Sequence, residues 1–271
     1  MKTKKCLFKR SKRNCIIFCV CAFVFALSLI GIFFSAENSK REKALFDEIR
    51  GLLEKASAKE KFEKEERSEL TEEKGQAERK ILDKYKSLFE MNEDMAGWIK
   101  IENTNIDYPV MVTPNAPDYY LYRAFDKTSS QSGTPFIGDG VSIESESVII
   151  HGHNMKDGSM FADLEKYEKE DFWRENPTFT FDTIYEERTF EVVSVIRTRV
   201  LYTHEEGFRY YRYSGDLEPK EKMKLFEEFK KLELYDTGAE VKNEDKLVML
   251  STCGYHEENG RIVLLGRLIS E

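Results

Sequence analysis

The sequence predicts a mainly β domain, a barrel or a sandwich with a few helices, carried behind an N-terminal membrane anchor. Three observations lead to this prediction. An uncharged apolar run covers residues 15–34, a stretch rich in Lys and Glu without proline follows to about residue 90, and short strand-like runs separated by turn signals fill the remainder. Many short strands of this kind are typical of barrels and sandwiches.

The first element, residues 1–14, is a basic tail with seven Lys and Arg and no acidic residue. Positive charge beside a membrane span is retained in the cytoplasm, so we expect everything after residue 35 to lie outside the cell. The rest of the chain has 35 basic and 50 acidic residues. This acidic balance disfavours nucleic acid as a partner, because phosphate binding needs clustered Lys and Arg.

The second element, residues 15–34, is predicted to cross a membrane as an uncleaved anchor. Twenty helical residues span roughly 30 Å, the thickness of a bilayer core. The alternative is a cleaved signal peptide, whose apolar core is usually about 7–15 residues long and ends in small residues. Here the large Phe34 is the third residue back from a cut after Ala36. We therefore expect a single-pass type II membrane protein with an extracytoplasmic domain.

The third element, residues 35–84, is predicted to be a charged, largely helical stalk. Apolar side chains recur at helical spacing within 45–56 and within 81–89,. The last turns of this segment are expected to pack on the domain that follows, residues 85–271.

That domain contains eight candidate strands and two candidate helices. The strand-like runs are 98–101, 108–112, 134–138, 147–153, 179–181, 189–202, 246–253 and 261–269. The helices are 159–176 and 216–234, and the second precedes the last two strands.

Cysteine usage singles out Cys253. The other four cysteines lie at residues 6, 15, 19 and 21, before or within the expected anchor. A disulfide within the exported part is therefore impossible, and a lone thiol in an exposed compartment is a candidate reactive group.

Three candidate catalytic side chains fall at strand ends. His153 closes the fourth run, Cys253 ends the seventh and Arg261 begins the eighth. Residues 257–260 form a predicted turn that would bring Cys253 and Arg261 to the same edge of adjacent strands. A thiol becomes a useful nucleophile beside a base or a cation, and Arg offers a planar fork of donors for an oxyanion or a substrate backbone.

These motifs resemble those of a known family. Leu250-Ser251-Thr252-Cys253 followed by Arg261, together with Gly152-His153-Asn154-Met155, is similar to the active-site signature of sortases. Further runs look like class B sortases in particular: Tyr120-Leu121 followed by Phe125, Gly133–Phe136, Ser159–Phe161 and the long helix before the cysteine strand. The resemblance covers about residues 85–271. It implies a closed eight-stranded β-barrel with N-terminal helices.

The resemblance also implies an activity. Class B sortases are cysteine transpeptidases of the cell surface that cleave a C-terminal sorting signal after a Thr through a thioacyl-enzyme. An amine of peptidoglycan, or of another pilin subunit, then accepts the protein. On this reading Cys253 is the nucleophile, His153 the general acid and base, and Arg261 the oxyanion or substrate stabiliser. Neither a metal nor an organic cofactor is implied.

The resemblance leaves some assignments open. Ser251, Thr252 and Leu121 match substrate-binding positions. The family usually has Tyr before the Gly-His pair, whereas this chain has His151, so the choice between the two imidazoles is not settled by sequence.

Two other functions are compatible with the residues. His151, His153, Cys253 and His256 supply four zinc-type ligands,, and this alternative predicts activity that depends on metal. A non-catalytic binding barrel would instead bury Cys253 as an inert thiol that resists alkylation.

Overall fold

A computed structural model describes residues 2–67, 80–138 and 141–270, with the side chains of the first range described from 17 to 62. The chain divides into two compact units, one ending at Leu45 and the other beginning at Phe46. The helix α1 (Lys2–Arg67) contributes to both. It contains no proline and is rich in Ala, Leu, Lys and Glu, which are strong helix formers,.

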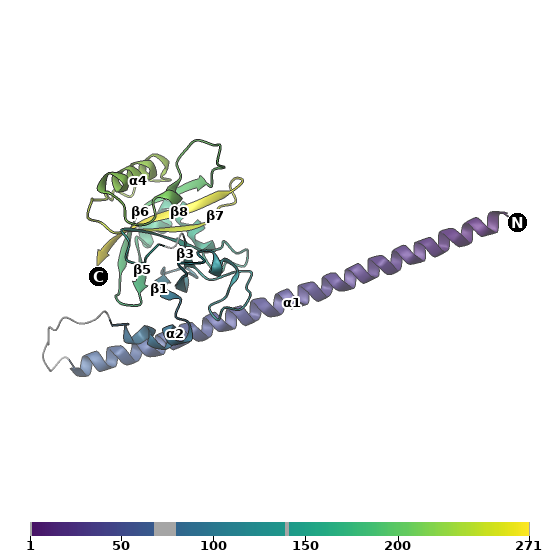
Figure 1. Cartoon of the computed structure of the whole chain (residues 1–271), viewed down its shortest axis with the longest axis horizontal. Coiled ribbons are helices and arrows are strands. Elements are labelled where there is room, and N and C mark those ends of the chain that lie inside the picture. The colour runs from purple at the N-terminus through teal and green to yellow at the C-terminus, as the bar shows by residue number, and fades with distance from the viewer. Residues whose placement is uncertain (1, 68–79, 139–140, 271) are drawn as a thin grey trace. The chain divides into compact units, whose positions relative to one another are not determined.

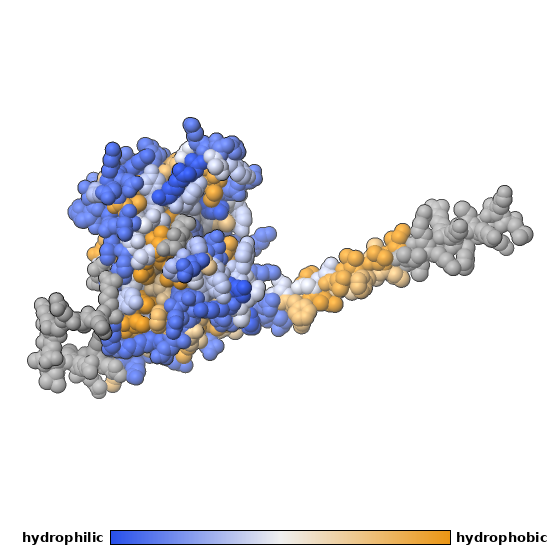
Figure 2. Space-filling view, viewed as in Figure 1, coloured by the Kyte–Doolittle hydropathy of each residue, from blue (hydrophilic) through white to orange (hydrophobic). Residues whose placement is uncertain are grey.

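In the first unit, α1 carries the apolar run that the sequence analysis assigns to the membrane. The side chains from Ile17 to Phe34 are exposed, and Figure 2 shows them as a hydrophobic surface on this section of the helix. Among the described residues, one helix, Ile17–Phe62, is long and apolar enough to cross a membrane. A membrane anchor and a signal sequence both have these properties.

The second unit is built on a closed barrel, shown in Figure 1. Its strands are β1 (Met95–Lys100), β2 (Asp107–Val112), β3 (Phe136–Ile137), β4 (Ser147–His151), β5 (Thr178–Thr183), β6 (Thr189–Arg199), β7 (Leu247–Cys253) and β8 (Gly260–Ser270). They are hydrogen-bonded in the order β1-β2-β3-β4-β7-β8-β6-β5. The predicted eight-stranded barrel is therefore confirmed, and each strand overlaps one of the predicted runs.

Two parallel pairings decide where the strand ends lie. β2 pairs with β3 and β4 with β7 in parallel, and the other pairs are antiparallel. β7 lies between β4 and β8, and its residues from Leu247 to Thr252 are all buried. The ends of β4 and β7 and the start of β8 thus meet at one rim of the barrel.

The long helix predicted before the cysteine strand is α4 (Pro219–Leu232). Pro219 at its first position and a capping box between Glu218 and Glu221 define its start,. Leu225 and Phe229 are fully buried in a core cluster with residues of β6, β7 and β8, and Figure 1 shows α4 lying over these strands.

The other predicted helix, 159–176, is not continuous. It consists of a 3-10 helix, η3 (Ala162–Glu168), and a short α-helix, α3 (Glu170–Glu175), separated at Lys169. Phe161, Leu164 and Tyr167 are all buried. A three-residue repeat lies on one face of a helix with three residues per turn, so burying this face favours the 3-10 form.

The remaining short elements are η1 (Asp83–Tyr85), α2 (Lys86–Met91), η2 (Tyr119–Tyr122) and η4 (Tyr210–Arg212). Packing on the barrel begins earlier in the chain than the last turns of the predicted stalk. The ring of Phe46 in α1 meets that of Tyr108 edge to face at 5.4 Å, and Ile49 is fully buried. The boundaries proposed for tail, anchor, stalk and domain stay predictions.

Candidate active site

The turn between β7 and β8 brings Cys253 and Arg261 together. The two residues are direct partners in the antiparallel ladder, as the predicted turn requires. Gly254 N–H donates to the Gly260 carbonyl at 2.9 Å and closes this turn. Cys253 and Arg261 are both half-buried, so each side chain keeps access to solvent.

Backbone carbonyls of the turn hold the guanidinium of Arg261. Its Nη1 donates to the carbonyls of Gly260 at 2.8 Å and of Asn259 at 3.3 Å. Both bonds use the same nitrogen. The planar fork is therefore oriented at one end while it keeps further N–H donors for a bound group.

The parallel pair β4–β7 brings the histidine segment beside the cysteine strand. His151 is the ladder partner of Ser251. Gly152 N–H donates to the Ser251 carbonyl at 3.1 Å, and Thr252 Oγ1 donates to the Gly152 carbonyl at 2.8 Å. The chain that leaves β4 thus continues along Ser251 and Thr252, and His153 follows directly.

Asn154 completes this connection, and the sequence analysis did not single it out. Its Nδ2 donates to the Cys253 carbonyl at 2.8 Å and to Glu165 Oε1 at 2.6 Å. The hydroxyl of Tyr255 donates to the Asn154 carbonyl at 2.8 Å. Asn154 is buried, and these bonds fix the histidine loop to Cys253, Tyr255 and Glu165. Its place next to His153 in the motif was the one signal available in the sequence.

The imidazole of His153 has two neighbours on η2. Its Nε2 lies 2.8 Å from the Leu121 carbonyl, and its ring lies 5.5 Å from that of Tyr122 with a tilt of 38°. A carbonyl oxygen can only accept, so Nε2 carries the hydrogen of this bond. In the neutral imidazole, Nδ1 is then the nitrogen that can take a proton.

His151 has different surroundings. Its ring lies 5.5 Å from Phe136 of β3. A Cβ placed on Gly138 would come within 3.1 Å of the same imidazole. The two histidines therefore have separate environments, His151 against β3 and His153 on the loop that Asn154 ties to Cys253.

The hydroxyls of Ser251 and Thr252 are engaged within the protein. Both residues are buried. Ser251 Oγ is hydrogen-bonded to the hydroxyl of Tyr210 at 2.8 Å. Burial raises the pKa of Tyr210 above its ordinary value, so this hydroxyl stays protonated. Tyr210 was another residue that sequence reasoning missed, because nothing in residues 200–218 marks it apart from a local excess of tyrosine.

The arrangement of the four zinc-type ligands does not favour a metal centre. Within the part of the chain that the structure describes, no three His, Cys, Asp or Glu side chains form a cluster suited to a metal ion. His256 instead lies with Nε2 at 3.4 Å from Glu257 Oε1.

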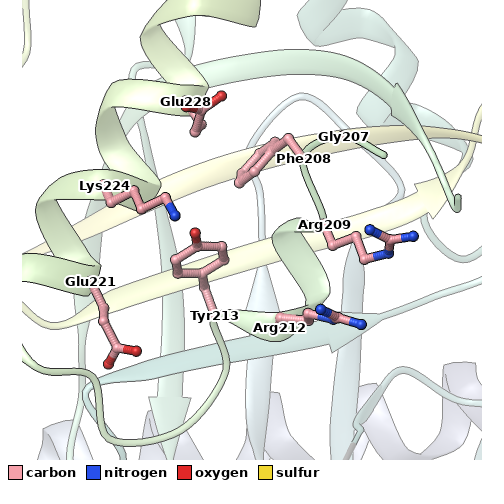
Figure 3. A pocket seen from close by; sticks show the side chains of 8 residues that line it. All are labelled: Gly207, Phe208, Arg209, Arg212, Tyr213, Glu221, Lys224 and Glu228. Carbon is pink, nitrogen blue, oxygen red and sulfur yellow. The ribbon is translucent and has the colours of Figure 1, made fainter. Parts of the chain in front are cut away.

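A cavity of about 570 Å³ lies between α4 and the segment 207–213, as Figure 3 shows. Arg209, Arg212, Glu221, Lys224 and Glu228 give it a mixed charged lining. Neither Cys253, His153 nor Arg261 lines it, so this cavity is distinct from the candidate active site.

Comparisons with known proteins identify the family. The sortase domain family matches residues 99–269. Sortase B of Listeria monocytogenes is 32% identical over 195 residues, which cover 70% of this chain and 76% of the relative. Sortase B of Staphylococcus aureus is 26% identical over 193 residues, with the same coverage of both chains.

Solved structures agree. The crystal structure of sortase B from Bacillus anthracis in complex with AAEK1 is similar with a TM-score of 0.67 and 26% identity, over 87% of this chain and 99% of that one. The match to the sortase domain family covers more than half of the chain and includes nearly all of the barrel. It excludes the alternative of a non-catalytic binding barrel. The chain belongs to the sortase family and is a cysteine transpeptidase of the sortase B type.

Proposed function

We propose that the chain is a membrane-anchored, extracytoplasmic transpeptidase that cleaves a C-terminal sorting signal after its Thr. It joins the released protein to an amine of peptidoglycan or of another pilin subunit. The observation that carries this proposal is the direct pairing of Cys253 with Arg261, beside the loop that Asn154 ties to Cys253.

The proposed first half-reaction forms a thioester. The thiolate of Cys253 attacks the carbonyl carbon of the Thr, and Arg261 donates N–H groups to the oxygen that becomes negative. His153 gives a proton to the departing amine as the C–N bond breaks. The acyl half of the substrate then remains on Cys253 Sγ.

The second half-reaction transfers the acyl group. The acceptor amine attacks the thioester carbon, His153 takes a proton from it, and the thiolate of Cys253 leaves. His153 and Cys253 thus reverse, in the second half-reaction, the roles that they have in the first. The proposal needs no metal or organic cofactor for either step.

Leu121, Ser251 and Thr252 are the proposed substrate-binding residues. The half-buried Leu121 is bonded to His153 through its carbonyl, which supports a place for its side chain beside the reacting group. Ser251 and Thr252 are buried and hydrogen-bonded. Ser251 would contact the peptide after its bond to Tyr210 opens, and Thr252 after its bond to the Gly152 carbonyl opens.

The proposed location rests on the N-terminal segment. A basic tail precedes the apolar part of α1, which supports a single-pass type II topology with the barrel outside. Sortases act outside the cytoplasm, in keeping with this orientation.

The first half-reaction is tested by trapping the acyl-enzyme. The full chain in detergent micelles is mixed with a panel of sorting-signal peptides, and its intact mass is measured. We expect an added mass equal to the peptide up to its Thr. The adduct should be absent in Cys253→Ala, strongly reduced in His153→Ala, less affected in His151→Ala, and unchanged by a chelator.

Two outcomes would contradict the assignments. Loss of the adduct on chelation would support the zinc alternative. Loss in His151→Ala with a normal adduct in His153→Ala would transfer the acid–base role to His151.

A further inference from the structure

Two exposed tyrosines flank the histidine segment and take no part in the two proposed half-reactions. Tyr122 is 59% exposed and Tyr255 is 67% exposed. Tyr122 contacts the imidazole of His153, and Tyr255 reaches the carbonyl of the next residue, Asn154. We call these two residues the tyrosine pair.

Tyr255 is the most exposed large hydrophobic side chain described in the second unit, and Tyr122 is also among the exposed ones. A scattered exposed ring needs no explanation, but two exposed tyrosines that contact consecutive residues of the histidine loop, His153 and Asn154, indicate a contact surface,.

Each tyrosine has a contact that positions it. The hydroxyl of Tyr255 is fixed by its 2.8 Å bond to Asn154. The backbone carbonyl of Tyr122, at the end of the helix η2, accepts a bond from Ser130 N–H at 3.1 Å, and its ring lies against that of His153. A tyrosine that is already positioned loses little conformational freedom when a ligand contacts it, which favours binding.

The chemistry of the second half-reaction suggests the ligand. A primary amine is protonated near neutral pH, because an α-amino group has a pKa of about 8 and a lysine-type amine of about 10.4. The acceptor therefore arrives as an ammonium ion. The face of an aromatic ring attracts such a cation.

From these observations we propose that the tyrosine pair is the subsite that receives the ammonium group of the acceptor. The inference rests on the proposed function and adds to it the residues that bind the second substrate. In this site the acceptor cation contacts the ring faces of Tyr122 and Tyr255, next to the base that must deprotonate it.

The protons of this step balance. The ammonium gives one proton to Nδ1 of neutral His153, which passes it to water, and the free amine then forms the new C–N bond with the thioester carbon. His153 takes the second proton lost by the nitrogen, the C–S bond breaks, and Cys253 leaves as the thiolate.

The test separates the amine step from acylation. The full chain in detergent is acylated with a sorting-signal peptide, and amide formation is followed against the concentration of triglycine, which is cationic. Hydroxylamine, which is largely uncharged at neutral pH, is the matched nucleophile. The variants are Tyr122→Leu and Tyr255→Leu, with Tyr255→Phe to keep the ring. Tyr202→Leu is the control, since Tyr202 is 48% exposed and its hydroxyl is bonded to Glu258.

We expect each Leu variant to raise the triglycine concentration for half-maximal amide formation by about 2- to 30-fold, the range for one cation–aromatic contact. For Tyr122→Leu, the acylation rate and the reaction with hydroxylamine should stay within about twofold of wild type. Tyr255→Leu and Tyr255→Phe both lose the bond to Asn154, so they should match each other in these two reactions, and only Tyr255→Phe should keep most of the triglycine affinity. Tyr202→Leu should behave as wild type.

Three results would overturn the inference. An equal weakening of the reactions with triglycine and with hydroxylamine would show that the rings do not distinguish a charged amine from an uncharged one. A slower acylation with an unchanged amine step would assign the tyrosine pair to the sorting signal. Wild-type behaviour of both Leu variants would show that the two rings do not bind the acceptor amine. In each case the acyl adduct still forms on Cys253, whereas absence of the adduct in the wild-type chain would refute the proposed function itself.

Discussion

Arg261 and Cys253 face each other across one pair of strands, so the role of each depends on a single register. The turn before Arg261 and the strand that ends at Cys253 are visible in the sequence, and their pairing could be predicted from it. The contacts of Asn154 and Tyr210 could not. They join residues about 100 and 41 positions apart along the chain, and only the folded barrel brings such positions together.

The proposed role of Arg261 predicts that its geometry matters as well as its charge. Lysine keeps the charge but has no planar fork. Loss of one oxyanion donor costs roughly 10²–10³ in rate. We therefore expect Arg261→Lys to lower kcat nearly as much as Arg261→Ala, measured by peptide turnover, with the circular dichroism spectrum of both variants unchanged. A Lys variant with near wild-type turnover would show that charge alone suffices.

At the scale of elements, periodicity predicted the strands well and the helices less well. The strand runs alternate with clear turn signals. The segment 159–176 was predicted as one helix, but its three-residue repeat of buried side chains follows a 3-10 helix instead,. In α4, two of the three buried side chains, Leu225 and Phe229, are apolar, whereas the third is Lys222.

Hydrogen bonds hold Lys222 on the buried face of α4. It is 1% exposed, and its Nζ donates to Glu146 Oε2 at 2.5 Å and to the carbonyls of Asn243 and Asp245 at 2.6 and 2.7 Å. One buried ammonium thus attaches α4 to the segments before β4 and β7. A sequence pattern places lysine on the solvent face of a helix, so this contact could not be predicted.

Replacing this lysine is expected to destabilise the barrel. Lys222→Met keeps the apolar stem but leaves two carbonyls and a carboxylate without their donor. We expect a loss of about 2–4 kcal/mol in the free energy of unfolding, measured by urea denaturation of the full chain in detergent. Lys224→Met is the matched control, because Lys224 is exposed on the same helix, and it should change stability by less than about 0.5 kcal/mol. Equal losses in both variants would contradict this account of Lys222.

At the scale of the whole molecule, the N-terminal segment decides where the enzyme works. The basic residues before Cys15 and the uncharged run to Phe34 predict an uncleaved anchor with the barrel outside. Protease added to intact protoplasts should then release a soluble fragment that begins between about residue 40 and residue 95 and contains the barrel. A barrel that is protected until the membrane is permeabilised would show the opposite orientation. Mature protein that lacks residues 1–36 would show a cleaved signal peptide.

The central claim is that an amine takes over an acyl group held on Cys253. It is tested most directly by isolating the acyl-enzyme, adding a primary amine and following two masses together, that of the protein and that of the released peptide. The account predicts that the adduct on Cys253 disappears at a rate that rises with amine concentration, and that the peptide leaves as the amide of that amine. Release only as the free acid, at a rate independent of the amine, would contradict it.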